Sequence, residues 1–229
     1  MNADEQTQQA LGLLRKIAET HVPAALAASF GAEDMVLIDL VARQRLSIEI
    51  FTLDTGRLPE ETQSLIHATT RRYQIPVAVI TPDAADIERY VAANGPNAFY
   101  DSQALRLECC FLRKVKPLRR ALAGKQAWIT GQRREQSVTR RDLKTQEWDA
   151  EHGLHKFNPL ADWSNDDVWR YIRQHSVPYN ALHDRGYPSI GCAPCTRAIA
   201  LGEDMRAGRW WWESAEHREC GLHPHRKAS

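Results

Sequence analysis

Long apolar stretches are absent from this sequence. No run approaches the roughly 20 apolar residues that a membrane-spanning helix needs, and the polar start MNADEQTQQ lacks the features of a secretory signal. The net charge is only +1, so there is no overall basic field of the kind that attracts nucleic acid. We therefore expect a cytoplasmic protein that binds neither membranes nor nucleic acid.

Cysteine is scarce, with five residues in a chain of 229. In a reducing compartment such thiols are expected to be free, metal-bound or catalytic rather than disulfide-bonded.

Lysine is scarce too, with 7 residues against 23 arginines. Arginine favours bidentate recognition of anions, although a GC-rich genome produces the same bias. The hydrophobic share of 43% and the charged share of 26% are typical of a globular protein with a core.

Short apolar runs alternate with longer amphipathic ones through most of the chain. We expect strands at 24–30, 48–53, 77–80, 127–131 and 155–160, and helices around 35–41 and at 58–73, 84–93, 112–123 and 166–175. This alternation predicts an α/β fold with a doubly wound, mainly parallel sheet. After about residue 186 the periodicity ends, which indicates an irregular C-terminal segment carrying cysteine. We expect an α/β domain over 1–200 and a mobile segment over 201–229.

Two cysteine pairs suggest a metal centre. Cys109 and Cys110 are adjacent in RLECCFLRK, and Cys192 and Cys195 form a Cys-x-x-Cys pair in SIGCAPCTR. Four thiolates could hold structural zinc or an iron–sulfur cluster, and the second pair alone could be a redox dithiol. Adjacent residues are hard to aim at two corners of a small zinc tetrahedron, so the pattern favours a 4Fe–4S cube. Lys114 stands four residues beyond Cys110, which at helical spacing places it on the same face.

The fifth thiol is Cys220, in the polar stretch HRECGLHPH. Neighbouring His and Arg side chains, including His223, would favour its thiolate and raise its reactivity. A nonfunctional tail cysteine is the plain alternative. The sharper hypothesis is a mobile cysteine that moves between a substrate and a reductant.

Loops that follow the expected strands carry the features of a nucleotide or anion site. Ligands of such sheets bind at the carboxyl ends of strands, which are followed here by SFGAED, LDTGR and GQRREQSVTRR. The first loop, with Ser29 and Gly31, suits an anion, but no Walker Gly-Lys-Ser/Thr follows it. In the second loop an ordinary turn competes with a nucleotide contact. The candidate contacts are Asp54, Thr55 and Gly56 in the second loop, Arg133 and Arg140 in the third, and Arg206 and Arg209 before the WWW run.

Several motifs together resemble the assimilatory adenylylsulfate (APS) reductases. They are SFGAED, LDTGRLPEET, ECCFLRKVKPL, GQRREQSVTR, KFNPLADWSNDDVW, YPSIGCAPCTR, GRWWWE and ECGLH, and they span about residues 25–225. The resemblance implies an adenine-nucleotide α-hydrolase-like fold. Relatives that cleave ATP carry a Ser-Gly-Gly-x-Asp-Ser loop, from which SFGAEDM departs. The departure argues against ATP cleavage and suits a ligand with one phosphate and one sulfate.

The resemblance also implies roles for individual residues. Adenosine 5'-phosphosulfate would be reduced to sulfite and AMP through a thiosulfonate on Cys220, which thioredoxin or a glutaredoxin-like thiol resolves. Cys109, Cys110, Cys192 and Cys195 match the ligands of a 4Fe–4S cluster. Lys114, Arg140, Arg206 and Arg209 match residues that bind the phosphosulfate or link it to the cluster, and Lys114 is expected to act in catalysis. The other expected substrate contacts are Ser29, Gly31, Asp54, Thr55, Gly56, Arg57, Arg133 and His223.

Two alternatives stay open at this point. Relatives that act on the 3'-phosphorylated substrate (PAPS) commonly lack the four cluster cysteines, so their presence favours APS, but some cluster-bearing members accept both. A zinc- or cluster-stabilised nucleotide-binding module without catalysis is the non-enzyme alternative, and it gives no reason for Cys220. We also expect a homo-oligomer, on the strength of the family resemblance alone.

Overall fold

The computed structural model describes residues 3–137 and 140–214 and is built on a six-stranded sheet. In chain order the strands are β1 (Ala24–Ala27), β2 (Ile48–Leu53), β3 (Val77–Ile80), β4 (Ala127–Ile129), β5 (Gln146–Asp149) and β6 (Leu154–Phe157). Their order across the sheet is β3-β2-β1-β4-β6-β5. All neighbours pair in parallel except β5 and β6, which are antiparallel. The mainly parallel sheet predicted from the sequence is confirmed.

Seven α-helices occur in the described ranges. They are α1 (Ala3–Thr20), α2 (Ala32–Arg43), α3 (Glu60–Tyr73), α4 (Ala84–Asn94), α5 (Gln103–Cys110), α6 (Lys116–Leu122) and α7 (Asn165–His175). Helix α7 begins with a capping box, in which the Ser164 hydroxyl accepts a hydrogen bond from the Asp167 N–H and the Asp167 carboxylate accepts one from the Ser164 N–H. No helix within these ranges is both long and apolar enough to cross a membrane.

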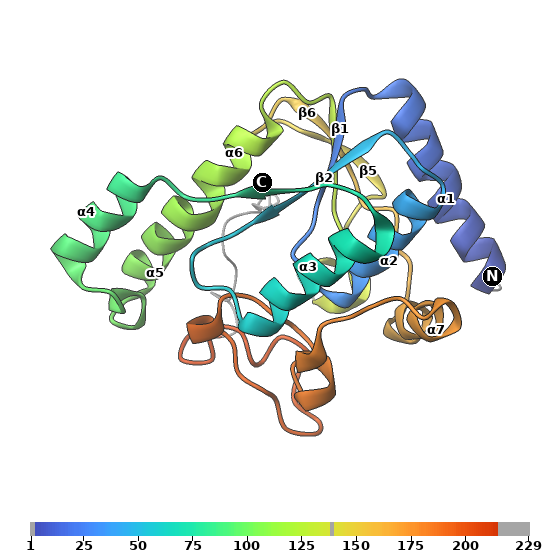
Figure 1. Cartoon of the computed structure of the whole chain (residues 1–229). Helices are drawn as coiled ribbons and strands as arrows, with labels where there is room; N and C mark the ends of the chain where they lie inside the picture. The colour runs from blue at the N-terminus through green and yellow to red at the C-terminus, as the bar shows by residue number, and fades with distance from the viewer. Residues whose placement is uncertain (1–2, 138–139, 215–229) are drawn as a thin grey trace.

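Hydrophobic side chains fill two cores, one on each face of the sheet. Alternate residues of a strand point to opposite faces. Leu26 and Ile50 therefore join the core beneath α1, α2 and α7, whereas Ala25, Phe51 and Trp128 join the core beneath α6. Because helices lie on both faces, the sheet is doubly wound, as predicted (Figure 1).

Some elements differ from the sequence prediction. Helices α1 and α5 and the edge strand β5 were not predicted, and strands β1, β4 and β6 end earlier than the expected 30, 131 and 160. The residues after those strands leave the sheet to form the site loops, so apolar composition there reflects burial rather than pairing. Helix α3 begins at Glu60 with Pro59 as its N-cap, two residues later than expected.

A π-helical turn, Phe111–Val115, joins α5 to α6 directly after the tandem cysteines. The expected helix 112–123 is thus the end of a longer helical run that starts at Gln103. In a π turn the hydrogen bonds reach one residue further than in an α-helix, which rotates the side chains that follow. Arg113, Lys114 and Val115 of this turn are all buried.

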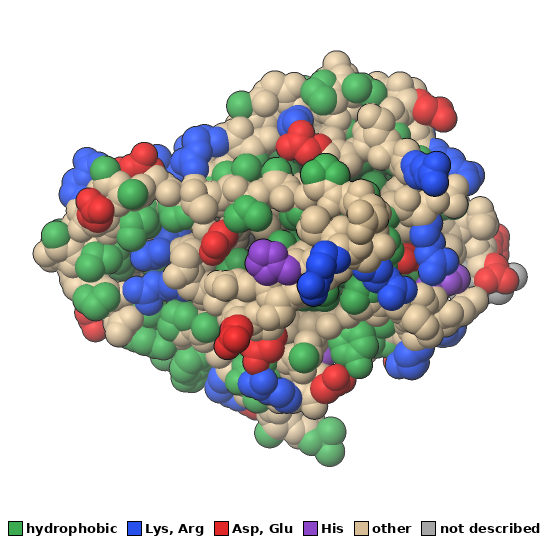
Figure 2. Space-filling view, viewed as in Figure 1, with side chains coloured by type: hydrophobic (Ala, Val, Ile, Leu, Met, Phe, Trp, Pro, Cys, Tyr) green, Lys and Arg blue, Asp and Glu red, His purple; other side chains and the backbone are tan. Residues whose placement is uncertain are grey.

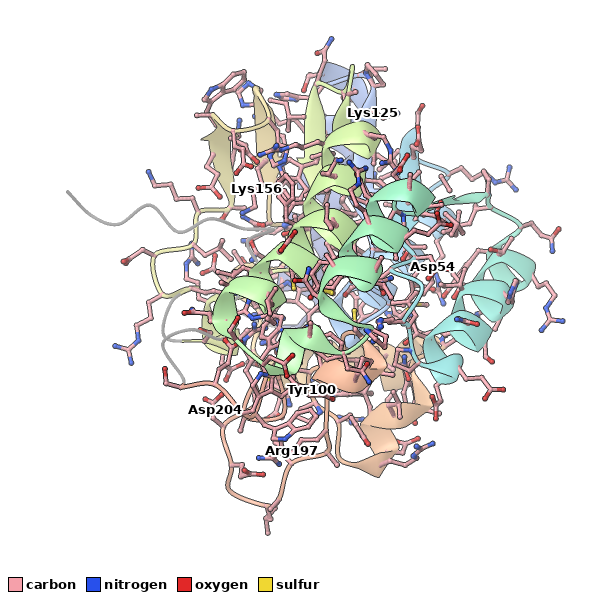
Figure 3. All side chains as sticks on the ribbon, turned by 90° about the vertical axis from the view of Figure 1, so that its left-hand side faces the viewer. Asp54, Tyr100, Lys125, Lys156, Arg197 and Asp204 are labelled. Carbon is pink, nitrogen blue, oxygen red and sulfur yellow. The ribbon has the colours of Figure 1, made fainter. Side chains whose placement is uncertain are left out.

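The segment after α7 is irregular, as expected, with two short 3₁₀ turns, Ala181–Arg185 and Ala193–Cys195. In Figure 1 it forms the orange-to-red loops beneath α3 and α5, at one end of the sheet. Figure 3 shows Arg197 and Asp204 of this segment at the end of the molecule opposite Lys125, which precedes β4. The segment therefore lies at the carboxyl ends of the parallel strands.

Candidate active site

A cavity of about 240 Å³ lies where the order of the parallel strands reverses. Strands β1 and β4 are neighbours in the sheet, but the chain runs from β1 to β2 on one side and returns to β4 on the other. Loops diverge at such a point and leave a crevice. The cavity is lined by the ends of β1, β2 and β4, the π-helical turn and residues 188–192 and 205–210 of the C-terminal segment.

The loop after β1 is held in shape by Asp34. The Asp34 carboxylate accepts hydrogen bonds from the Ser29 N–H at 2.6 Å and the Ser29 hydroxyl at 2.7 Å. Phe30 between them has a φ of +62°, a conformation rare for a bulky residue, and its ring is fully buried. Burial raises the pKa of Asp34 to about 6, against the opposing hydrogen bonds from Ser29. Ser29 and Gly31, which were predicted as substrate contacts, both line the cavity.

Two residues of the LDTGR stretch line the cavity, Leu53 and Thr55. Asp54 accepts a hydrogen bond from the Gly56 N–H at 2.9 Å and so shapes the turn (its position is labelled in Figure 3). Arg57 donates to Asn97 at 3.2 Å and to the Pro96 carbonyl, and its guanidinium lies over a phenylalanine ring. These three predicted contacts do not line the cavity.

Four basic side chains line the cavity, and all four were predicted from the sequence: Lys114, Arg140, Arg206 and Arg209. Arg209 is buried against Gly191, where a Cβ would lie 2.3 Å from its guanidinium, so only glycine leaves room for it. It donates to the Ile190 carbonyl at 3.1 Å. Charged groups of both signs are scattered over the face of the molecule seen in Figure 2.

Arg133 does not line the cavity, although it was predicted to contact the substrate. Its fully buried guanidinium donates from Nε to Glu33 Oε1 at 2.8 Å, to Glu135 at 3.0 Å and to the Trp163 carbonyl at 3.1 Å, and its Nη2 forms an ion pair with Glu33 Oε1 at 2.7 Å. These contacts join the loop after β1 to the loop after β4. This network reaches the cavity through Glu33 and Gln136, and neither residue was predicted from the sequence.

The four cysteines of the two pairs come together in one buried hydrophobic cluster. Cys109, Cys110, Cys192 and Cys195 are each less than 9% exposed, are free thiols, and pack with Phe99 and Trp210. Within the described ranges, no group of three or more Cys, His, Asp or Glu side chains is arranged to hold a single metal ion. The two pairs, which are far apart in the sequence, thus lie together in the fold.

Polar groups around the thiols fit an anionic sulfur cluster. The Thr55 hydroxyl lies 3.2 Å from Cys192 Sγ, and the Trp210 indole N–H and Arg113 Nε are buried with no hydrogen-bond partner among the described residues. Buried donors of this kind are normally satisfied. Sulfur acceptors between the two pairs would satisfy them, which is a physical reason why these residues suit a thiolate-bound cluster.

The two thiols of the Cys-x-x-Cys pair differ in their electrostatic surroundings. Burial raises the pKa of Cys195 to about 12, and the neighbouring Cys192 adds to the effect. Burial acts on Cys192 in the same direction. Lys114, the Thr55 hydroxyl and Arg209 outweigh it, so the pKa of Cys192 is lowered. Cys192 is also the only one of the four that lines the cavity, so the cations of the cavity face a thiol as well as the space for a ligand.

The C-terminal segment is anchored to α5 next to the tandem cysteines. Arg106 donates to both carboxylate oxygens of Glu213, at 2.9 and 2.6 Å, and both side chains are buried. Of the three consecutive tryptophans, Trp210 is buried and Trp211 is 37% exposed, as the sequence predicts for side chains that cannot all face one way. Cys220 and His223, the predicted nucleophile and a predicted substrate contact, lie outside the described residues.

Sequence comparison places this chain among known reductases. A model of the phosphoadenosine phosphosulfate reductase domain matches residues 23–198. An adenosine 5'-phosphosulfate reductase from Allochromatium vinosum is 56% identical over 93% of this chain and 84% of that protein. An adenosine 5'-phosphosulfate reductase from Neisseria meningitidis serogroup B is 51% identical over 96% of this chain and 89% of that protein.

Structural comparison supports the predicted fold. A phosphoadenylyl-sulfate reductase from Candida auris, solved with phosphate, covers 86% of this chain and 96% of its own with a TM-score of 0.71 and 26% identity. An FMN adenylyltransferase from Candida glabrata shares the fold at a TM-score of 0.58 and 15% identity, covering 99% of this chain and 81% of its own. The adenine-nucleotide α-hydrolase-like fold expected from the sequence is therefore confirmed.

Proposed function

Because the chain belongs to the phosphoadenosine phosphosulfate reductase domain family, we propose that it reduces adenosine 5'-phosphosulfate to sulfite and AMP in assimilatory sulfate reduction. The observation that carries the proposal is the cavity at the strand switch point, where four cations converge beside Cys192. A nucleotide with adjoining phosphate and sulfate needs this kind of anion site. The relatives named as adenosine 5'-phosphosulfate reductases support the choice of substrate.

The chemistry divides between the cations and Cys220. The Cys220 thiolate attacks the sulfur of the substrate, an S–S bond forms, and the S–O bond to the phosphate breaks, so that AMP leaves with the electron pair. Lys114, Arg206 and Arg209 stabilise the charge that builds on the departing phosphate. The product on the enzyme is a thiosulfonate on Cys220. This step needs no external electron.

A dithiol completes the cycle. One thiol of a thioredoxin, or of a glutaredoxin-like protein, attacks the Cys220 sulfur and releases sulfite, and its second thiol closes the disulfide and frees Cys220. The two electrons of the reduction come from this dithiol. The proposal places the reaction in the cytoplasm, where such dithiols are kept reduced. It also assigns residues 1–200 to nucleotide and metal binding, residues 201–229 to delivery of the nucleophile, and a homo-oligomer to the working form.

We propose that Cys109, Cys110, Cys192 and Cys195 hold a 4Fe–4S cluster. The buried N–H donors of Trp210 and Arg113 support it, as does the anchoring of both cysteine pairs in one buried cluster. A cluster would supply a fixed anionic group behind the cations of the cavity and would tie the C-terminal segment to α5. Iron and acid-labile sulfide in anaerobically purified protein should each amount to about four per chain.

The 3'-phosphorylated substrate is the second candidate. The Candida auris phosphoadenylyl-sulfate reductase shares the fold over nearly its full length, and this likeness is the reason to test the 3'-phosphorylated substrate. The four cysteines favour the substrate without the 3'-phosphate. The test is to measure sulfite and adenine-nucleotide product with each substrate and reduced thioredoxin. We expect the chain to prefer APS, and equal or better turnover of the 3'-phosphorylated compound would contradict that choice. No turnover of either would favour a nucleotide-binding module instead.

A further inference from the structure

We infer that Gln136 is a positioning residue, which holds the Arg140 guanidinium toward the substrate anion without adding a negative charge beside it. The inference rests on the proposed function. Gln136 ends the 3₁₀ turn Arg134–Gln136 after β4, and both Gln136 and Arg140 line the cavity. A nitrogen of the Arg140 guanidinium donates a hydrogen bond to Gln136 Oε1.

The contacts of the Gln136 amide fix which way it points. Its nitrogen donates to Glu33 Oε1 at 2.9 Å, and its oxygen accepts from the Arg133 backbone N–H at 3.1 Å as well as from Arg140. A carboxylate can only accept and an N–H can only donate. The amide nitrogen must therefore face Glu33, and the amide oxygen must face Arg140. A flipped amide would set its NH₂ group against the two donors, Arg133 N–H and Arg140, and its oxygen against the Glu33 carboxylate.

The partners of Gln136 are themselves held firmly. Glu33 accepts a hydrogen bond from Nε of the buried Arg133 guanidinium and forms an ion pair with its Nη2, and the guanidinium also donates to the Trp163 carbonyl just before α7. Glu135 continues this network, because its carboxylate accepts from Arg133 at 3.0 Å and from the Asn165 N–H at 2.5 Å. The orientation of Arg140 is thereby linked to the start of α7 through Gln136, Glu33 and Arg133.

An amide at this position has a clear advantage over a carboxylate. A glutamate at 136 would accept the same hydrogen bond from Arg140, so orientation alone does not distinguish the two side chains. It would, however, add a full negative charge next to the guanidinium, inside a cavity that must receive a phosphosulfate. Gln136 supplies the acceptor and also keeps the carboxylate of Glu33 engaged through its own N–H groups.

Equilibrium binding of two ligands tests the inference. APS carries the anion, whereas adenosine has the same nucleoside without it. We expect Gln136→Glu to raise the Kd for APS about tenfold and Gln136→Leu to raise it about threefold, because a charge-assisted contact is weakened. The Kd for adenosine should stay within about twofold in both variants, since the nucleoside contacts are unchanged. Gln63→Leu, at an exposed position of α3, is the matched control and should change neither Kd.

A charge swap sharpens the test. The double variant Glu33→Gln/Gln136→Glu has the same composition and net charge as the natural chain, but it moves the carboxylate next to Arg140. We expect its Kd for APS to rise as in Gln136→Glu. In an Arg140→Ala background, Gln136→Leu should add no further loss of APS affinity, because it acts through Arg140.

Two results would overturn the inference. One is natural affinity for APS in Gln136→Glu, and the other is a parallel loss of APS and adenosine binding, which would mean that Gln136 only maintains the fold. A natural chain that neither binds nor reduces APS would instead overturn the proposed function, and the inference with it. The two failures are therefore distinguishable by the behaviour of the unsubstituted protein.

Discussion

Trp210 is the side chain on which the cations around the thiols converge. Its ring centroid lies 4.7 Å from the guanidinium carbon of Arg209, 4.9 Å from that of Arg106 and 5.8 Å from Lys114 Nζ. Each cation–π contact is worth about 0.5–2 kcal/mol, more when desolvated. Trp210 also has a φ of +43°, which costs on the order of 1–3 kcal/mol for a residue other than glycine. The contacts with the cations offset this strain and hold the ring between the thiols and the cavity.

Lys114, like Arg209, is buried, lines the cavity and acts on Cys192. Lys114→Ala should lower kcat/KM by at least about 100-fold, in the range seen when a group that stabilises transition-state charge is removed. Iron and sulfide content should be retained, because the thiols are intact. Lys116→Ala is the control, since Lys116 is 39% exposed and pairs with Asp86 away from the cavity. Unchanged turnover in Lys114→Ala, measured as sulfite release, would reduce Lys114 to a packing role.

Asp34 predicts a pH dependence of stability. Its pKa is raised to about 6 in the folded protein from 3.8, mainly by burial, so between these values the folded state binds more protons than the unfolded state. Stability from this group is therefore full below about pH 4 and declines as the pH rises toward 6, by about 3 kcal/mol in total. Urea unfolding from pH 4 to 7 should show this component. Asp34→Asn should flatten the pH profile by that amount, and an unchanged slope would contradict the shift.

At the scale of elements, the loops after β1 and β4 meet at Gly131. A Cβ on Gly131 would lie 2.4 Å from Asp34 Oδ1 and 2.9 Å from Glu33 Cβ, so no other residue allows the two loops to approach this closely. Because both loops line the cavity, their separation sets its width. Glycine is thus needed at position 131 for the close approach of the two loops at the cavity, and not for pairing within the sheet.

Gly131→Ala should force the two loops apart. We expect a loss of about 1–3 kcal/mol in the free energy of unfolding, as for overpacked cores, together with weaker APS binding. Gly12→Ala, in the middle of α1 where a Cβ would meet no atom within 4 Å, is the matched control and should stabilise the protein by about 0.5–1 kcal/mol. Equal effects of the two substitutions, by thermal unfolding and ligand titration, would contradict the role given to Gly131.

Sequence reasoning succeeded where local pattern and tertiary position agree. The parallel strands are apolar runs bounded by turns, and loops after β1, β2 and β4 must meet in a doubly wound sheet, so Ser29, Thr55 and Arg140 could be placed in advance. Edge strand β5 was missed because its sequence, QEWD, has few apolar residues. Helix α1 was missed although its buried face, with Leu14 and Ile17, follows helical spacing.

Other features depend on contacts that no local pattern reveals. Arg133 and Arg140 follow the same strand and look alike in sequence, yet one is buried against Glu33 and the other lines the cavity. Their separation is decided by Glu33, which is a hundred residues away in the chain. The π-helical turn Phe111–Val115 is a further feature that the sequence pattern did not predict.

On the scale of the whole molecule, the sheet and the C-terminal segment supply complementary parts of one site. The strand loops provide Ser29, Thr55 and Arg140, while the segment after α7 provides Cys192 and Arg209. The four thiols are buried between α5 and that segment. The cysteine pairs therefore help to hold the segment where it lines the cavity. The Arg106–Glu213 ion pair then fixes the chain seven residues before Cys220, so that a reach of at most about 25 Å separates the anchor from the proposed nucleophile.

The central claim is that Cys220 takes the sulfur from APS. Its most direct test is a single turnover, with anaerobic protein and APS but no thioredoxin, analysed by mass spectrometry of the digested chain. The account predicts about one AMP released per chain and one added SO₃ group, found on Cys220 and absent from Cys220→Ser. An SO₃ group on another cysteine, or one AMP released per chain by Cys220→Ser under the same conditions, would contradict it.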